Sequence, residues 1–351
     1  MQREVILSAR DVEIKFDLRG QTLTAIRGIS LDLYKGESLA IVGESGSGKS
    51  VFNKAFMGLL EENGWISNGQ ILYKGHDLAQ FKTEKDWLKI RGKEIAMVFQ
   101  DPMTSLNPLK TVGKQIQETI EMHHPGVNRQ KAREMSMDIL RDVGILFPEK
   151  RFKQYPHEFS GGMRQRVVIA ISIACNPNIL ICDEPTTALD VTIQAQIIEL
   201  LKNLQRKYGL TIIYITHDLG VVANVADRVA VMYAGDIVEV GQSEEIFYNA
   251  KHPYTWALLS SLPQLGVKGE TLYSIQGTPP NLFHEIQGDA FAPRNPHALE
   301  IDFIKRPPYF DVSASHKAKT WLLDPRAPKL DPPELIRKMQ EKWKGAQDRG
   351  R

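Results

Sequence analysis

The sequence has little cysteine and no long apolar run. Its 351 residues include only two cysteines, Cys175 and Cys182, and both stand inside apolar stretches. We expect them to be small core residues and not a disulfide pair, which suits a reducing cytoplasm. The longest largely apolar stretch, 167–175, is too short to span a bilayer, so a role at a membrane would require docking on another protein there.

A strong charge of either sign is also absent. The formal net charge is +2, which gives no field that points to nucleic acid or to an acidic partner. Hydrophobic residues make up 42% and charged residues 25%, the shares of an ordinary globular protein, and the length is enough for two domains. Residues 1–6 lack the apolar core of a signal peptide, and we expect none at this end.

Strand and helix periods alternate along most of the chain. Period-two patterning runs through 4–42, and helical patterns fill 112–146 and 192–207. Short apolar runs typical of buried strands lie at 94–99, 179–182 and 211–216. This order predicts an α/β fold with a parallel sheet covered on both faces and an additional antiparallel β portion before the first helix.

The composition changes after about residue 245. Of the 19 prolines, 12 lie within 251–351, so we expect a smaller, loop-rich part there. Residues 334–344 have the charges of an exposed helix. The chain is therefore expected to consist of a main domain followed by a C-terminal appendage.

Residues 43–50 form a complete phosphate-binding motif, G-x-x-x-x-G-K-S, between an apolar strand and a helical run. Glycines let backbone N–H groups turn inward around a polyphosphate, and the helix N-terminus adds its positive end. Lys49 is expected to reach the β- and γ-phosphates, and the Ser50 hydroxyl to contact Mg²⁺. The residues expected around the phosphates are Gly43, Ser45, Gly46, Ser47, Gly48, Lys49, Ser50 and Val51. The motif predicts binding of a nucleoside triphosphate.

Two acids, Asp183 and Glu184, end the apolar strand that begins at Ile179. Acids at the carboxyl edge of a parallel sheet stand beside the phosphate loop. We expect Asp183 to hold Mg²⁺ together with Ser50, and Glu184 to orient or deprotonate the attacking water.

A second glycine-containing helix start, at 159–166, contains Ser160, Gly161, Gly162 and Met163. With this motif the chain resembles the ATP-binding-cassette (ABC) ATPases, in which the signature contacts the γ-phosphate held by a partner subunit. Met163 stands where many members carry glutamine. The resemblance implies a P-loop NTPase fold of ABC type, with a mixed RecA-like core, an antiparallel β portion and a helical subdomain.

The remaining family elements follow in order. Gln100 resembles the glutamine that contacts Mg²⁺ and water and senses the membrane subunits, and His217 the switch histidine that grips the γ-phosphate. Asp190 resembles the loop residue that crosses between subunits. Phe16 is the candidate for stacking on adenine, although a strand core residue would have the same pattern. The resemblance thus implies ATP and Mg²⁺ as ligands, with Gln100 joining Ser50 and Asp183 at the metal.

The tail resembles that of oligopeptide and dipeptide importers, notably at 252–263 and 277–280. We expect a nucleotide-binding domain at 1–245, with its helical subdomain at about 101–165, and an importer-type extension at 246–351. Many members carry a cysteine cluster in this extension, with an iron–sulfur group expected on it. Here the positions are taken by Asp289, Asn295, Asp302 and Thr320, so no such cluster is expected. Arg294 is assigned to the folding of the tail, with its role left open.

The resemblance implies an ATPase subunit of a peptide importer, peripheral on the cytoplasmic face of the cell membrane. The implied partners are a second homologous ATPase subunit, two integral membrane permease subunits and an external peptide-binding protein, with no nucleic acid. One alternative is the same role in an importer of nickel or another small solute. Another is a soluble ABC ATPase outside transport, which is disfavoured because the chain has one cassette and no heptad run.

Overall fold

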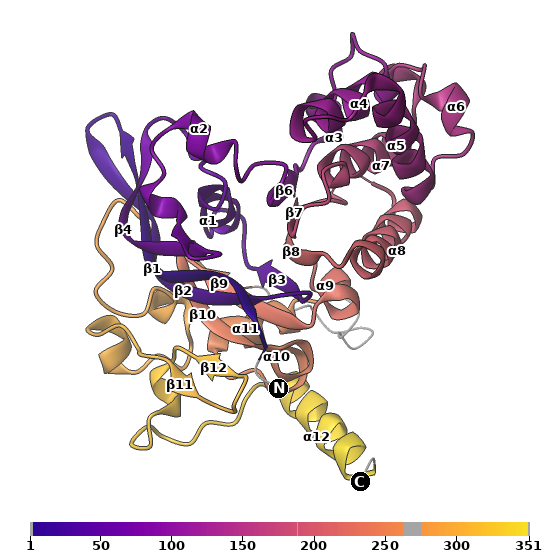
Figure 1. The fold of residues 1–351 in the computed structure, drawn as a ribbon. Helices are drawn as coiled ribbons and strands as arrows, with labels where there is room; N and C mark the ends of the chain where they lie inside the picture. Colours follow the sequence, from indigo (N-terminus) through magenta and orange to yellow (C-terminus); the bar gives the residue numbers. More distant parts are fainter. Residues whose placement is uncertain (1–2, 188, 263–274, 350–351) are drawn as a thin grey trace. The chain divides into compact units, whose positions relative to one another are not determined.

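The computed structural model describes residues 3–187, 189–262 and 275–349. Contacts divide the chain into two compact units, each assembled from segments that are distant in sequence (Figure 1). The first consists of Met1–Ile6, Tyr34–Ser38 and Gln80–Ile215, and the second of Leu7–Leu33, Leu39–Ala79 and Thr216–Arg351. Within the described ranges, no helix is both long enough and apolar enough to cross a membrane.

Three neighbouring parallel strands form the sheet of the first unit: β6 (Ile95–Val98), β7 (Ile179–Asp183) and β8 (Thr211–Thr216). Every residue of these strands is buried, which explains their unbroken apolar runs. The sequence predicted all three correctly. Because the strands are parallel and in register, their carboxyl ends lie at one edge, where Gln100 and Glu184 follow β6 and β7.

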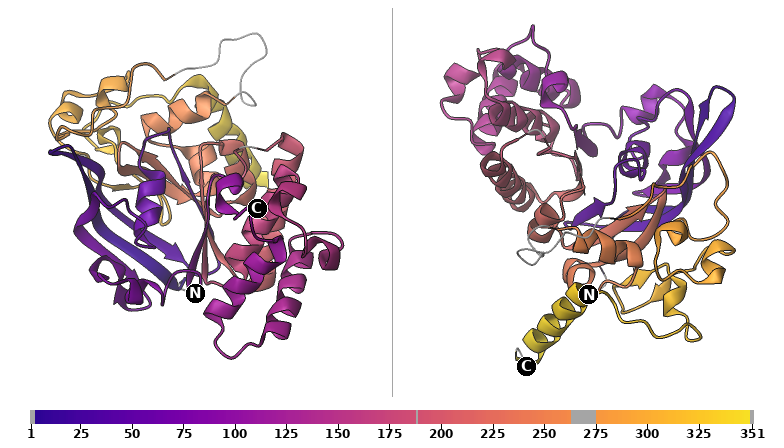
Figure 2. Two further views of the ribbon diagram at one scale, coloured as in Figure 1. Left: turned by 90° about the horizontal axis from the view of Figure 1, so that it is seen from above. Right: turned by 180° about the vertical axis from the view of Figure 1, so that it is seen from behind.

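Helices make up most of the rest of the first unit, and Figure 2 shows those between residues 102 and 208 gathered beside one another in purple and magenta. Val112, Ile116 and Ile120, four positions apart, are buried on one face of a helix that meets two others. A Cβ at Gly113 would come within 2.1 Å of the Phe152 ring, so this close approach needs glycine. The helices are α2 (Glu84–Trp87), α3 (Pro102–Ser105), α4 (Val112–His123), α5 (Arg129–Asp142), α6 (Pro148–Arg151), α7 (Gly161–Ile173) and α8 (Val191–Tyr208).

An antiparallel sheet makes up much of the second unit, as the period-two pattern predicts. Arg19 and Gly20 connect its first two strands with left-handed backbone, at φ 57° and 82°. Alternate residues Val12, Ile14 and Phe16 are buried. The strand order is β2–β1–β4–β5, from β1 (Val5–Leu18), β2 (Gln21–Tyr34), β4 (Gly64–Tyr73) and β5 (His76–Asp77).

A second set of strands in this unit joins the N-terminal part to the C-terminal part. Its order is β11–β12–β10–β9–β3, with β9 parallel to β3 and the other pairs antiparallel. The bounds are β3 (Ser38–Val42), β9 (Arg228–Tyr233), β10 (Asp236–Gln242), β11 (Phe310–Asp311) and β12 (Lys317–Ala318). The helices are α1 (Lys49–Ala55), α9 (Leu219–Val225), α10 (Ser243–Asn249), α11 (Pro253–Ser260) and α12 (Glu334–Arg349).

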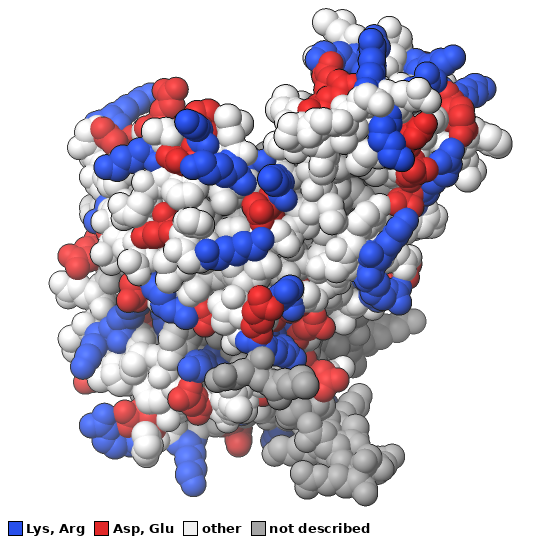
Figure 3. All heavy atoms as spheres, viewed as in Figure 1, with Lys and Arg blue, Asp and Glu red and all other residues white. Residues whose placement is uncertain are grey.

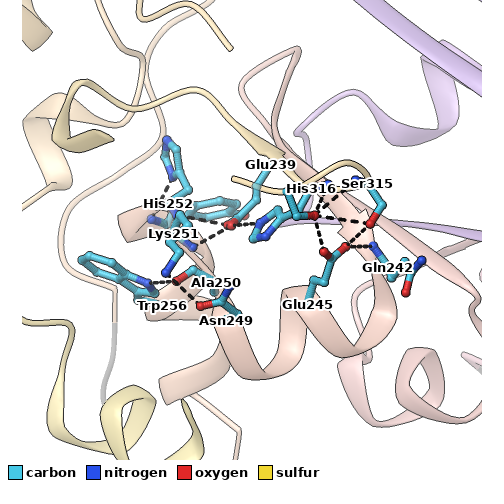
Figure 4. Close-up of polar contacts among 12 residues, drawn as sticks. Glu239, Gln242, Glu245, Asn249, Ala250, Lys251, His252, Trp256, Ser315 and His316 are labelled. Atoms are coloured by element: carbon cyan, nitrogen blue, oxygen red, sulfur yellow. Dashed lines mark hydrogen bonds and ion pairs between the residues drawn. The ribbon is translucent and has the colours of Figure 1, made fainter. Parts of the chain in front are cut away.

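A buried carboxylate on β10, Glu239, links three segments of this unit (Figure 4). It accepts hydrogen bonds from the backbone N–H groups of Lys251, at 2.6 Å, and His252, at 3.1 Å. Its Oε1 also lies 2.7 Å from Nε2 of His316, and neither side chain is exposed. Because a buried carboxylate needs such partners, Glu239 fixes the start of α11 and the strand β12 against β10.

The helix predicted near the end of the chain is present as α12, but the expectation that it is exposed is only partly right. Ile336 and Met339 are buried, and the helix contacts α10 and α11. Charged side chains such as Lys338 and Glu334 cover its outer face. An apolar stripe three residues apart therefore anchors one side of this helix.

Candidate functional site

Two glycines shape the phosphate loop, which runs from β3 into α1. A Cβ on Gly43 would lie 2.0 Å from the Met232 carbonyl oxygen, and one on Gly48, at φ 101°, would lie 2.8 Å from Ile26 Cδ1. The Lys49 ammonium curls back over the loop and donates to the carbonyl oxygens of Gly43 and Glu44, each at 2.8 Å. The backbone thus forms a tight turn that closes around the lysine, as a phosphate cradle requires.

The acids lie where the sequence predicted, at the end of β7. Asp183 is the last strand residue and is buried. Glu184 follows with left-handed backbone at φ 46°, a conformation that costs a non-glycine residue about 1–3 kcal/mol and is concentrated at functional sites. Its Oε2 accepts hydrogen bonds from Gln100 Nε2 and Thr187 Oγ1, each at 2.8 Å. The structure therefore brings Gln100 and Glu184 together.

His217 follows β8 and is exposed. The next residue, Asp218, caps α9 by accepting a hydrogen bond from Gly220 N at 2.8 Å, and this contact fixes the turn that carries His217. The Asp218 backbone N–H in turn donates to Thr216 Oγ1 at 3.0 Å. An exposed imidazole on a fixed turn is well placed to contact a ligand.

The signature residues form the start of α7. Ser160 is its N-cap, and Oγ accepts from Met163 N at 3.4 Å. Ser160 and Gly161 are exposed, whereas a Cβ on Gly162 would lie 2.6 Å from Ile193 Cγ2 on α8. The positive end of a long helix is thereby left open to solvent.

Asp190 is the exposed N-cap residue of α8, and its side chain makes no capping hydrogen bond. Its neighbour Ala188, in the same predicted inter-subunit loop, lies outside the described residues. Pro263, at the end of one of the importer-like stretches of the tail, also lies outside them. The exposed Asp190 carboxylate at the start of α8 is available to a partner chain.

Phe16, the adenine-stacking candidate, is only 8% exposed. It pairs across the sheet with Gly64, and a Cβ on that glycine would come within 2.5 Å of the ring. This packing favours the strand-core alternative that the sequence left open.

One contact to the phosphate loop could not be predicted from the sequence. Arg294 follows the loop residue Glu44 by 250 positions, yet its guanidinium binds the Glu44 carboxylate through Nη1 at 2.8 Å and Nη2 at 3.0 Å. Burial works to lower the pKa of Arg294, but the hydrogen bonds to Glu44 and Tyr233 outweigh it and raise the pKa overall. Two residues so far apart carry no periodic or motif signal that could have paired them.

The four tail positions where many family members have cysteine make local hydrogen bonds instead. Each side-chain oxygen accepts from a backbone N–H two or three residues away: Asp289 from Phe291, Asn295 from His297, Asp302 from Leu299 and Thr320 from Leu322. Within the described ranges no group of three His, Cys, Asp or Glu side chains could hold a metal ion. These oxygens do not fit an iron–sulfur cluster, which takes thiolate ligands.

Comparisons with known proteins match both parts of the chain. A family model for ABC transporters matches residues 26–187, and one for the C-terminal region of oligopeptide/dipeptide transporters matches 238–301. The oligopeptide transport ATP-binding protein AmiE of Streptococcus pneumoniae is 58% identical, over 97% of this chain and 96% of that protein. The oligopeptide transport ATP-binding protein OppD of Bacillus subtilis is 56% identical, over 96% of this chain and 94% of that protein.

One solved structure has a fold similar to that of this chain. It is the dimeric, post-hydrolysis state of an ATP-binding cassette bound to ADP and Pi. It is 26% identical, has a TM-score of 0.60, and matches 68% of this chain and 98% of its own.

Proposed function

Because this chain belongs to the ABC transporter family, in the branch of the oligopeptide and dipeptide transport ATP-binding proteins, we propose that it hydrolyses ATP to drive a peptide importer. The observation that carries the proposal is the phosphate loop closed around Lys49 and shaped by Gly43 and Gly48. We assign the nucleotide-binding domain to 1–245, with the helical subdomain at about 101–165, and the extension to 246–351.

The residues present fit ATP and Mg²⁺. Ser50, Asp183 and Gln100 supply hydroxyl, carboxylate and amide oxygens, which are the hard ligands that Mg²⁺ takes. The ion, when bound, neutralises charge on the phosphates. Lys49 would exchange its two carbonyl partners for the β- and γ-phosphates.

We assign a role in hydrolysis to Glu184, the acid that follows β7. Glu184 would take a proton from the attacking water, and the hydrogen bonds from Gln100 and Thr187 to its Oε2 support this role. His217 would contact the γ-phosphate, where its ring N–H can stabilise developing charge. The residues Gly43, Ser45, Gly46, Ser47, Gly48 and Val51 would surround the phosphates.

The signature supports a site shared between two chains. Ser160 and Gly161 expose an anion-binding helix end, and Asp190 is exposed as well. We propose that Ser160 to Met163 contact the ATP held by a second, homologous ATPase subunit, whose own signature completes the site of this chain. Closure over two nucleotides, followed by hydrolysis, would then supply a mechanical stroke.

The helical subdomain offers a surface for the permease subunits. A groove of about 780 Å³ is lined by four basic side chains, Lys114, Arg129, Arg133 and Lys153, beside Phe152. Large apolar side chains are also exposed in this stretch, at Leu109, Met122, Leu146 and Phe147. These side chains would supply apolar contacts in a protein docking surface. We propose docking on two integral membrane subunits at the cytoplasmic face, in a complex that includes an external peptide-binding protein.

The surface charge supports transport over a role with nucleic acid. Figure 3 shows Lys and Arg interspersed with Asp and Glu over the face drawn, and the net charge is +2. A nucleic-acid binder would carry a basic stripe or patch. The net charge and the face drawn therefore disfavour the alternative of a soluble ABC ATPase outside transport that would act on nucleic acid.

The cargo is tested by uptake in cells that lack this chain. Labelled peptide should enter only when the wild-type gene is restored, and the Glu184→Gln variant should not restore uptake. Labelled nickel is measured in the same cells. Peptide uptake that is unchanged by the loss, together with lost nickel uptake, would replace the peptide assignment by the alternative cargo.

A further inference from the structure

The C-terminal extension contacts the phosphate loop at Glu44. The Arg294 side chain, only 6% exposed, forms two parallel hydrogen bonds to the Glu44 carboxylate. Bidentate pairs between guanidinium and carboxylate are among the strongest and most directional contacts in proteins. Arg294 thus fixes the direction of this loop side chain.

A second element of the extension holds the backbone of the same residue. The Glu44 N–H donates to the hydroxyl of Tyr254, on α11, at 2.8 Å. The Glu44 carbonyl oxygen in turn accepts from Lys49 Nζ at 2.8 Å. Glu44 therefore stands between the extension and the lysine that is expected to bind the phosphates.

Arg294 and Tyr254 are themselves held in a buried aromatic cluster. The rings of Tyr233, Tyr254 and Phe291 lie 4.6–5.3 Å apart. Arg294 Nη1 also donates to the Tyr233 hydroxyl at 3.1 Å, and Nε donates to the Gln276 carbonyl at 2.9 Å. A guanidinium with this many partners has little freedom, so its position is fixed by the extension and the loop together.

We propose that Arg294 is a positioning residue for ATP: acting through Glu44, it keeps the phosphate loop in its binding shape and couples the extension to the nucleotide site. The inference deepens the proposed function and rests on it. If the loop loses this support, ordering it becomes part of the cost of binding ATP. The coupling is reciprocal, so bound ATP should also tighten the extension.

The test is ATP affinity of the purified full-length chain, measured by calorimetry with Mg²⁺. Arg294→Ala should raise the Kd by about tenfold, within the usual range of coupling between sites. Arg294→Lys, which keeps the charge but not the fork, should lie between Arg294→Ala and the wild type. The matched control is Arg326→Ala, because Arg326 is 84% exposed and ion-paired with its near neighbour Asp324 in the same extension.

Glu44→Gln removes the same contact through a change in the phosphate loop and not in the extension. It therefore separates loss of the contact from unfolding of the extension by Arg294→Ala. It should raise the Kd in the same direction, and combining it with Arg294→Ala should add little further. A wild-type Kd in both Arg294→Ala and Glu44→Gln would overturn the inference while leaving the proposed function intact. A wild-type chain that fails to bind ATP would overturn the proposed function, and the inference with it.

Discussion

The Gln100 side-chain amide donates a hydrogen bond of 2.8 Å to Oε2 of Glu184, joining the ends of two neighbouring parallel strands. Thr187 Oγ1 donates to the same oxygen at the same distance. Because both donors bind the same oxygen, they fix the orientation of the Glu184 carboxylate. Both donors belong to the same unit as Glu184.

Removing the carboxylate should abolish turnover but not ATP binding. We expect Glu184→Gln to lower ATP hydrolysis by the assembled transporter by at least about 100-fold, since a general base contributes at least that much. Gln100→Ala should have a smaller effect, because Thr187 still holds Glu184. In that variant, Ser50 and Asp183 also still supply two of the three proposed Mg²⁺ ligands. Steady-state phosphate release measures both. Turnover close to wild type in Glu184→Gln would show that another group activates the water.

The two thiols should be unreactive in the folded protein. Burial raises the pKa of Cys175 to about 11. For Cys182, burial first and then the nearby Asp183 raise the pKa further. Since the thiolate is the reactive form, a disulfide reagent at pH 8 should modify neither cysteine in native protein and both in denaturant. Rapid modification of either thiol without denaturant would contradict the burial of these two side chains.

Replacing the buried Asp302 with asparagine should stabilise the extension at neutral pH. Burial raises the pKa of Asp302, an effect opposed by the hydrogen bond from Leu299 N–H and reinforced by nearby Asp289. The folded state therefore binds the proton more tightly than the unfolded chain. The contribution of Asp302 to stability is therefore greatest at low pH and declines as pH rises through its folded-state pKa, which lies above 3.8.

Asparagine keeps the acceptor for Leu299 N–H and removes the charge. We expect Asp302→Asn to raise the free energy of unfolding by about 1 kcal/mol at pH 7, and by less at lower pH. Denaturant unfolding at pH 7 and pH 5 measures the difference. A variant that is less stable than wild type at pH 7 would mean that the ionised carboxylate is favourably held.

Removing Glu239 should loosen the extension. Glu239→Ala leaves His316 and two backbone N–H groups buried without their acceptor, a loss of about 3–5 kcal/mol when one partner of a buried pair is removed. The free energy of unfolding, followed by tryptophan fluorescence, measures it. Glu4→Ala removes an exposed carboxylate paired with Lys35 and serves as the control, with an expected change within about 0.5 kcal/mol. Equal stabilities for the two variants would rule out the anchoring role of Glu239.

Local patterns predicted much of this structure. The run 211–216 is β8 to the residue, and the helical pattern at 192–207 is α8 with one residue more at each end. Both the strand pattern and the helix pattern are determined by residues that are close together in the sequence. The phosphate loop likewise carries its own chemistry in eight consecutive residues, 43–50.

What could not be predicted depends on contacts between distant segments. Glu44 looks like a variable position of its motif, and only the fold brings Arg294 to it. Glu239 occupies a strand position that would ordinarily be apolar, and its three partners come from later in the chain. The burial of Phe16 depends in the same way on Gly64 across the sheet.

The measurement that tests the central claim most directly is ATP hydrolysis by the assembled transporter with Lys49→Ala in this chain. Lys35→Ala serves as a control, because that lysine is exposed and paired with Glu4. Removing a charge that stabilises the transferring phosphoryl group should cost at least about 100-fold in turnover, while the control stays at the wild-type rate. Wild-type turnover and ATP affinity in Lys49→Ala would contradict the assignment of the phosphate loop and the function built on it.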